Sequence, residues 1–118
     1  TLALITSPLR FFSWFKKDFA QFAGNETRLP FDQHFLRALI APRAVLCTEA
    51  REDTWANPDG NEAAFDAAQP VFDFLKVPTH NALRIREGQH DQLAEDFQAL
   101  LDFADTIFNT QGNTPGNR

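Results

Sequence analysis

The chain has 118 residues, which is enough for at most one domain, and its 43% of apolar residues is enough for a hydrophobic core. A formal net charge of −5 argues against a nucleic-acid or anionic-membrane partner, because both partners are themselves negative. No apolar run approaches the roughly 20 residues of a membrane span. A single cysteine, Cys47, excludes an internal disulfide and fits a buried packing residue in an apolar run.

The first distinctive feature is an aromatic segment, residues 11–22. Four of its phenylalanines recur in steps of three or four, as one face of a helix requires: Phe11, Phe15, Phe19 and Phe22. We therefore expect a helix over 10–22 that ends at Gly24. Such a stripe usually packs into a core, and the alternative is an exposed aromatic groove that binds a ligand.

A short helix is expected next, from the capping residue Asp32 to Ala41, where Pro42 stops it. Its apolar face carries four residues: Phe35, Leu36, Leu39 and Ile40. His34 falls in the first turn of this helix. The pattern leaves two roles open for His34, a structural hydrogen bond or a supporting place in a site.

A fully buried strand is predicted over 44–47, because Ala-Val-Leu-Cys is a short, continuous apolar run. Three carboxylates follow it: Glu49, Glu52 and Asp53. Trp55 comes next, and then a turn over 57–60. Carboxylates just past the end of a buried parallel strand lie where α/β proteins build their sites.

The second half of the chain predicts a helix over 61–75, a strand over 82–86 and a final helix over 93–108. Pro70 should kink or split the first of these helices. The loop after the second strand carries His90. Residues 1–110 would belong to a single domain, and 111–118 would be a disordered tail.

This alternation of helices and strands predicts an α/β fold with parallel strands and flanking helices, joined by right-handed crossovers. Asp53 and His90 would then lie on adjacent loops at one edge of the sheet. An acid followed by a histidine is the second half of a serine hydrolase triad in the chain order nucleophile, acid, histidine. The competing interpretation is a loop histidine that caps the last helix.

The nucleophile of such a triad is missing from the chain. The only serines, Ser7 and Ser13, lack the flanking glycines that a nucleophile elbow requires. The sequence also has no glycine-rich phosphate loop and no His-Glu-x-x-His motif. Its three histidines are too scattered to suggest a metal site.

Five segments, in this order and spacing, resemble the glucuronoyl esterases, carbohydrate esterase family 15: LPFDQH (29–34), ALIAPR (38–43), DTWANPDG (53–60), GQHD (88–91) and LDFAD (101–105). Any one of these segments alone would be a weak signal, whereas their combination is fairly specific. The resemblance covers residues 10–108.

The resemblance implies an α/β-hydrolase without metal or cofactor, which cleaves the ester between 4-O-methyl-glucuronic acid of xylan and lignin alcohols through a serine acyl-enzyme. It implies that His90 is the catalytic histidine, that Asp53 is the acid and that Trp55 lines the glucuronate pocket. Many members use instead a glutamate after an earlier strand. Glu49, Glu52 and His34 are further candidates for supporting roles.

By the same resemblance, the chain is the C-terminal part of an α/β-hydrolase domain, an incomplete domain whose N-terminal half carries the serine and the oxyanion hole. We expect the fragment alone to be inactive, and the intact parent to be secreted or periplasmic. Two other hypotheses stay open. One is another carbohydrate esterase of the same fold, such as an acetyl xylan esterase. The other is a non-catalytic module that binds through 11–22.

Overall fold

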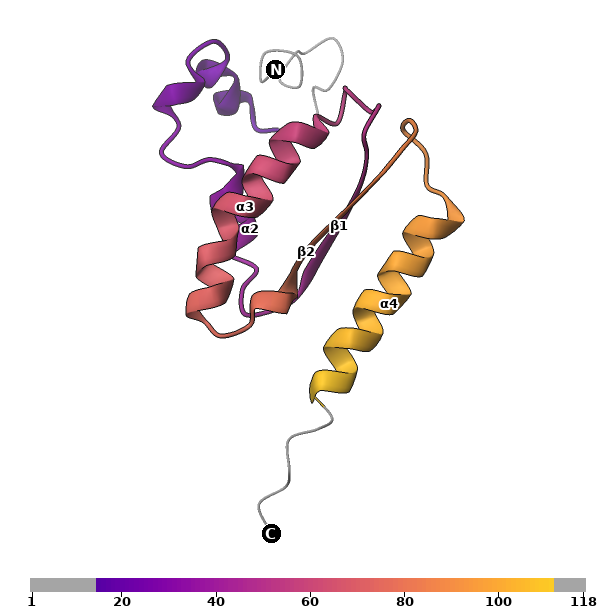
Figure 1. The fold of residues 1–118 in the computed structure, drawn as a ribbon. Coiled ribbons are helices and arrows are strands. Elements are labelled where there is room, and N and C mark those ends of the chain that lie inside the picture. Colours follow the sequence, from indigo (N-terminus) through magenta and orange to yellow (C-terminus); the bar gives the residue numbers. More distant parts are fainter. Residues whose placement is uncertain (1–14, 112–118) are drawn as a thin grey trace. The chain divides into compact units, whose positions relative to one another are not determined.

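A computed structural model describes residues 15–111 of the chain (Figure 1). The chain divides into two units, with the boundary between Asp32 and Gln33. No helix in the described range is both long enough and apolar enough to cross a membrane. The predicted tail, 111–118, lies outside this range except for Gln111.

The described part of the first unit consists of irregular chain and two short 3-10 helices, Lys17–Phe22 and Glu26–Arg28. Phe15 stacks on Phe19 with the ring centroids 5.1 Å apart. The helix expected over 10–22 is therefore a 3-10 turn in its second half, and its first residues lie outside the described range. Gly24 has a φ of 75°, which glycine adopts without strain, and follows the turn as predicted.

The second unit is an α/β arrangement built on two strands. Its regular elements are α2 (Gln33–Ala38), β1 (Val45–Ala50), α3 (Pro58–Phe74), a 3-10 turn (Pro78–His80), β2 (Asn81–Arg86) and α4 (Ala94–Gln111). Within the described residues, β1 and β2 form a parallel two-stranded sheet. Helices α2 and α3 lie on one face of this sheet and α4 on the other (Figure 1). The predicted α/β class with parallel strands is confirmed.

The register of the two strands determines where their loops leave the sheet. Val45 lies opposite Asn81 at the amino ends, and Ala50 lies opposite Arg86 at the carboxyl ends. Both following loops therefore start at the same edge. This is the edge at which the sequence places its candidate site.

Strand β1 is longer and less buried than predicted. It runs to Ala50 and so includes Glu49, and within the described structure Ala50 is its one buried residue, whereas Val45 to Glu49 are half-buried. The prediction of a fully buried strand over 44–47 is wrong for this structure. An apolar run indicates a strand, but it does not report how many neighbouring elements cover that strand.

Helix α3 begins three residues earlier than predicted. The side chain of Asn57 caps it by accepting a hydrogen bond from the Gly60 amide at 3.3 Å, and Pro58 takes the first helical position. The turn predicted over 57–60 is therefore the start of the helix. Asn followed by Pro is a signature that turns and helix starts share.

Helix α3 also continues through Pro70 without interruption, so the predicted split does not occur. Proline removes one backbone hydrogen bond inside a helix and crowds the preceding turn. The residues Ala68 and Phe72, on either side of it, are fully buried. Their packing offsets that local cost, which the sequence pattern alone did not reveal.

Two of the predicted apolar helix faces lie on the surface of the described structure. Helix α2 ends at Ala38, four residues before Pro42, and irregular turns complete the predicted helix. Seven large apolar side chains on these faces are 46–73% exposed: Phe35, Leu36, Leu39, Phe97, Leu100, Leu101 and Phe108. Ile107 is the buried exception on α4. The small core of this unit thus centres on Phe72 of α3, which is fully buried.

A polar network closes the amino end of the sheet. The guanidinium of Arg37 donates to Asn81 Oδ1 at 2.5 Å, to the Ala82 carbonyl at 2.7 Å and to Cys47 Sγ at 3.0 Å. Asn81 is 5% exposed and donates in turn to Gln69 Oε1 at 2.9 Å. These bonds tie α2, α3 and both strands together.

His80 lies beside this end of the sheet. It is half-buried, and its Nδ1 lies 2.6 Å from the Pro42 carbonyl oxygen. The ring thus links the 3-10 turn before β2 to the segment before β1. Its role in the described structure is structural.

Candidate active site

The two loops at the carboxyl ends of β1 and β2 are joined to each other by backbone hydrogen bonds. The Arg51 amide donates to the Arg86 carbonyl at 2.8 Å, and the Glu52 amide donates to the Gly88 carbonyl at 3.0 Å. The ladder between the strands thus extends into both loops. Because these bonds keep the two loops side by side for two more residues, the side chains that follow on each loop lie opposite one another.

Asp53 and His90 meet at this point. Nδ1 of His90 lies 2.5 Å from Oδ2 of Asp53, and the Ala56 amide donates to Oδ1 at 3.2 Å. The hydrogen bond with His90 is the main cause that lowers the pKa of Asp53, the amides of Ala56 and Trp55 add to it, and burial opposes it. The aspartate is therefore held as a carboxylate acceptor.

The exposure of the two partners differs sharply. Asp53 has a side chain only 9% exposed, whereas the His90 side chain is 74% exposed. A carboxylate at Nδ1 fixes the imidazole so that the other nitrogen, Nε2, is the one that exchanges protons with a reacting group. The pair has the geometry of a general base held by an acid. The structure brings together the two residues that the sequence singled out.

Trp55 stands beside the imidazole. Its ring lies edge-on to His90, with the centroids 5.8 Å apart and the planes at 86°. The residue is 54% exposed, so a large part of its surface is open. An open indole next to a histidine can pack against a sugar ring.

Glu49 lies in β1 rather than past its end. Asn61 of α3 donates to its Oε1 at 2.8 Å and also to the Ala56 carbonyl at 3.3 Å. Burial is the main cause that raises the pKa of Glu49, and the nearby charge of Asp53 adds to it. Glu49 thus lies close enough to Asp53 for the two carboxyl groups to interact electrostatically, beneath the loop that carries Trp55.

The other two supporting candidates are less closely placed. Glu52 has an exposed side chain, and its amide is the group that joins the loops. His34 lies in the first turn of α2, half-buried, with its ring centroid 4.3 Å from that of Phe35. The structure therefore gives His34 a packing contact on a helix and places Asp53 and His90 on the loops past the strands.

Sequence reasoning missed Arg86, the last residue of β2. Its Nε lies 2.9 Å from Oδ2 of Asp96 in the first turn of α4, and both side chains are less than a tenth exposed. The charge signs at the end of a strand and the start of the next helix were a usable signal. Charged residues are common at both places, however, so these signs alone do not single out a buried pair.

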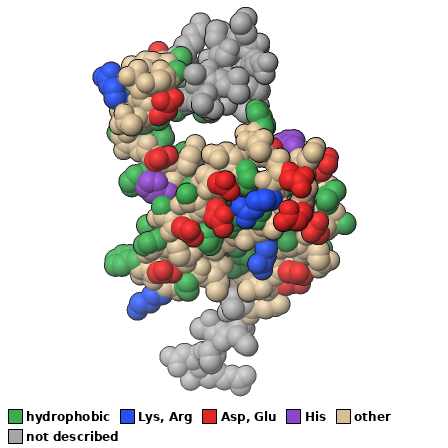
Figure 2. All heavy atoms as spheres, turned by 45° about the horizontal axis from the view of Figure 1, so that its top comes forward, with side chains coloured by type: hydrophobic (Ala, Val, Ile, Leu, Met, Phe, Trp, Pro, Cys, Tyr) green, Lys and Arg blue, Asp and Glu red, His purple; other side chains and the backbone are tan. Residues whose placement is uncertain are grey.

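The charges around this edge are mostly acidic (Figure 2). Arg51 pairs there with Asp59 at 3.2 Å and with Glu62 at 3.3 Å, both in the first turns of α3. Among residues 15–111, no group of three or more histidine, cysteine, aspartate or glutamate side chains is placed to hold a metal ion.

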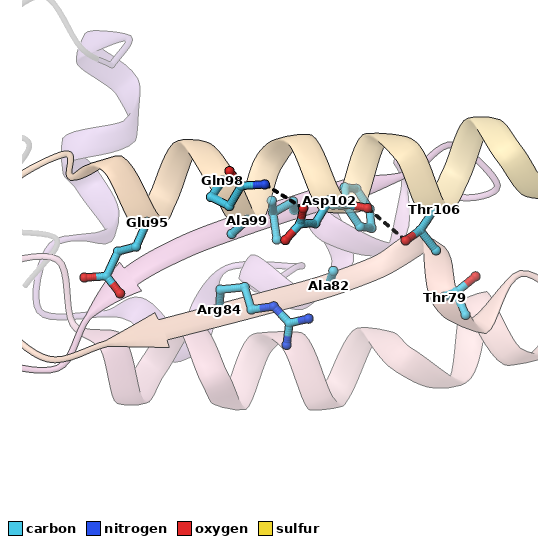
Figure 3. Close-up of a pocket in the computed structure, with 10 residues that line it drawn as sticks. Thr79, Ala82, Arg84, Glu95, Gln98, Ala99, Asp102 and Thr106 are labelled. Atoms are coloured by element: carbon cyan, nitrogen blue, oxygen red, sulfur yellow. Dashed lines mark hydrogen bonds between the residues drawn. The ribbon is translucent and has the colours of Figure 1, made fainter.

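A separate cavity of about 450 Å³ lies between α4 and the strands (Figure 3). Arg84 lines it from β2, and Gln98 and Asp102 line it from α4. The Gln98 amide donates to Asp102 at 2.8 Å, so these two polar groups engage each other along the helix. Asp53, Trp55 and His90 are not among the lining residues, and the cavity is distinct from the loop site.

Comparison with known proteins gives a consistent set of relatives. A family model described as "Glucuronyl esterase, fungi" matches residues 5–76. "Carbohydrate esterase MZ0003", from an unknown prokaryotic organism, is 39% identical over 107 residues, which cover 78% of this chain and 25% of that protein. A 4-O-methyl-glucuronoyl methylesterase of Phanerochaete carnosa is 30% identical over 89 residues, covering 75% of this chain and 22% of that protein.

A solved structure agrees with these relatives. It is a glucuronoyl esterase of carbohydrate esterase family 15 from Caldicellulosiruptor kristjansonii, with a TM-score of 0.83 and 37% identity. The match covers 89% of this chain and 27% of that one. The chain thus spans about a quarter of the length of the relatives it matches.

Proposed function

The chain belongs to the glucuronoyl esterase family, carbohydrate esterase family 15, and from that premise we propose that it supplies the histidine and acid of a serine esterase. The substrate class is an ester of 4-O-methyl-glucuronic acid, such as the link between xylan and lignin. The observation that carries the proposal is the 2.5 Å contact between Asp53 Oδ2 and His90 Nδ1, with the rest of the imidazole exposed. The intact protein is here the polypeptide that holds this chain together with the nucleophile.

The first half of the reaction forms an acyl-enzyme. The serine hydroxyl oxygen attacks the ester carbonyl while His90 Nε2 takes its proton, and Asp53 stabilises the imidazolium that results. The tetrahedral intermediate then collapses. The bond from the acyl carbon to the alcohol oxygen breaks, and His90 returns the proton to the leaving alcohol.

The second half frees the enzyme. Water attacks the acyl carbon, His90 takes one of its protons, and the bond to the serine oxygen breaks as His90 protonates that oxygen. The uronic acid is released. The oxyanion of both intermediates needs hydrogen-bond donors, which the intact protein supplies from outside this chain.

Trp55 is proposed to bind the sugar. Its exposed ring stands 5.8 Å from that of His90, a separation at which a pyranose ring on the indole brings its ester to the imidazole.

Three observations support a requirement for more of the domain than this chain contains. The only serines of the chain, Ser7 and Ser13, have no elbow glycines. The chain spans about a quarter of its relatives. The apolar faces of α2 and α4 are exposed, as expected where further elements of a hydrolase domain cover them. From the family membership we also propose that the intact protein is secreted or periplasmic.

The test is turnover by the intact protein on the methyl ester of 4-O-methyl-glucuronic acid and, in parallel, on acetylated xylan. We expect hydrolysis of the uronate ester, and a loss of about 10³-fold in kcat for His90→Ala, because the general base is gone. His80→Ala is the matched control, since His80 lies outside the site and should leave turnover within about twofold of wild type.

Near-normal turnover by His90→Ala would remove His90 from the mechanism. Hydrolysis of acetyl groups without uronate esters would instead favour an acetyl xylan esterase. The purified 118-residue chain should show no turnover above the buffer rate, because a general base without a nucleophile has nothing to activate.

A further inference from the structure

A buried arginine lies under the loop that carries His90. The side chains of Arg86 and Asp96 are 8% and 7% exposed, and Arg86 Nε lies 2.9 Å from Asp96 Oδ2. A buried ion pair is a weak source of net stability, because both charges lose their water. Its presence at the end of β2 therefore calls for a reason other than stability alone.

The other two nitrogens of the same guanidinium also donate to that loop. Nη1 donates to the Glu87 carbonyl at 3.0 Å, and Nη2 donates to the Gln89 carbonyl at 3.4 Å and to the Asp91 carbonyl. Two of the three carbonyls belong to the residues directly before and after His90. The loop is thus folded around the arginine, with the histidine between two of its anchors.

Gly88 shows how closely the loop wraps the guanidinium. It has a φ of 100°, a conformation that side-chain-bearing residues rarely adopt. A Cβ atom at this position would lie 3.1 Å from Arg86 Nη1. The backbone conformation and the close approach both depend on the absence of a side chain.

Asp96 connects this arrangement to α4. Its Oδ2, the atom that pairs with Arg86, also accepts a hydrogen bond from the Leu93 amide at 2.9 Å. The start of the helix is therefore locked to the end of β2 through one carboxylate. The loop from Glu87 to Leu93 is fixed at both ends by a single buried pair.

We propose that Arg86 is a positioning residue for catalysis, which holds the His90 loop so that the imidazole meets the Asp53 carboxylate. The inference rests on the proposed function, because it gives Arg86 a role in that same reaction. Arginine suits the task because its planar fork offers five N–H donors in fixed directions. A lysine keeps the charge opposite Asp96 but has one ammonium, which cannot reach carbonyls on several sides.

The decisive variant is Arg86→Lys in the intact protein, since it keeps the buried Asp96 paired and the fold intact. We expect kcat to fall about tenfold or more with KM changed less than about twofold, because the histidine is misplaced while sugar contacts remain. Amide hydrogen exchange over residues 87–92 should become about tenfold faster. Arg84→Met is the matched control, an exposed arginine two residues earlier on β2, and should change neither quantity.

A second readout separates positioning from a merely structural role. In the wild type, the hydrogen bond from His90 is the main cause of the lowered pKa of Asp53, with Glu49 the other titratable group close to it. Carboxyl NMR titration should find the Asp53 pKa moved back toward the ordinary aspartate value in Arg86→Lys and unmoved in Arg84→Met.

Two outcomes would overturn the proposal. One is an Arg86→Lys protein with wild-type loop exchange and kcat. The other is a protein that melts earlier while the Asp53 pKa and kcat stay at wild-type values, since Arg86 would then only stabilise the fold. If the wild type proves inactive on uronate esters, the proposed function fails, while loop exchange and the Asp53 titration still report whether Arg86 orders the loop.

Discussion

The two ends of the paired strands are each built around an arginine, and the two arginines have different surroundings. At the amino end, Arg37 donates to a side-chain oxygen, a backbone carbonyl and a thiol, all belonging to regular elements. At the carboxyl end, Arg86 pairs with Asp96 and donates its other hydrogen bonds to carbonyls of the loop that carries His90. One arginine fastens helix to strand, and the other fixes an irregular segment.

The side chains around each arginine differ in the same way. At the amino end, Asn81 is buried and both its donors and its acceptor are engaged, so the network is closed. At the carboxyl end, the loop that Arg86 holds by its backbone carbonyls carries the His90 imidazole, which is 74% exposed. A closed network contributes stability and specificity of packing, whereas an open one leaves a reactive group facing outward. The candidate site thus lies at the end of the strands where the arginine holds a loop that carries an exposed imidazole.

The largest effect that tests this contrast concerns the amino end. Arg37→Met in the intact protein should lower the free energy of unfolding by roughly 2–4 kcal/mol, because the buried acceptor of Asn81 and the Ala82 carbonyl lose their donor. Denaturant titration measures this loss. The kcat per folded molecule should stay at the wild-type value, since Arg37 lies at the end of the strands away from His90.

Arg43→Met is the control for this variant. Arg43 is exposed and donates to the Ile40 carbonyl at 3.3 Å, so its removal should shift stability by less than about 0.5 kcal/mol. If Arg37→Met unfolds at the same denaturant concentration as Arg43→Met, the amino-end network is not a stabilising element and the contrast between the ends is lost.

A smaller effect, on substrate binding, is expected at the carboxyl end of the strands from Trp55→Ala. Because Trp55 is 54% exposed, its loss should leave the melting temperature within a few degrees of wild type. Loss of the sugar contact should raise KM for the uronate ester about tenfold, measured by steady-state kinetics. Trp55→Phe keeps an aromatic face and should recover part of that affinity. An unchanged KM together with a strongly destabilised fold would make Trp55 a structural residue.

The smallest effect concerns the pH dependence of stability beneath the site. The pKa of Glu49 is raised, mainly by burial, so its contribution to stability is present in acid and lost as pH rises through the folded pKa. Glu49→Gln should therefore stabilise the protein at neutral pH, by less than about 1 kcal/mol after solvent screening, and lose this advantage at about pH 4.

Asp53 and Asp96 have the opposite sign, which provides an internal check. Their pKa values are lowered, by the His90 hydrogen bond for Asp53 and by the Leu93 amide and Arg86 for Asp96. They contribute stability above the ordinary aspartate pKa and lose it as pH falls through the folded values. A Glu49→Gln protein that is less stable than wild type at neutral pH would contradict the assigned cause of the raised pKa.

Local sequence patterns were sufficient to predict the strands and helices of the second unit and to pair Asp53 with His90. An apolar run, an alternating run and a helical period between them imply two parallel strands, and parallel strands put their following loops at one edge. Asp53 and His90 can therefore be paired from the sequence alone. The same reasoning missed the start of α3 over 57–60, because local signals there also fit a helix, and of the two outcomes predicted at Pro70 the split does not occur.

The sequence by itself determined the α/β class, the family resemblance and the two residues that meet at the sheet edge. Tertiary structure alone decided that Glu49 lies within β1, that His80 contacts the Pro42 carbonyl and that Arg86 anchors the loop around His90. The physical reason is range. The patterns that predict strands and helices repeat every few residues, so a short stretch of sequence contains them. The burial of a side chain and the hydrogen-bond partners of a guanidinium depend instead on segments far apart in the sequence, which only folding brings together.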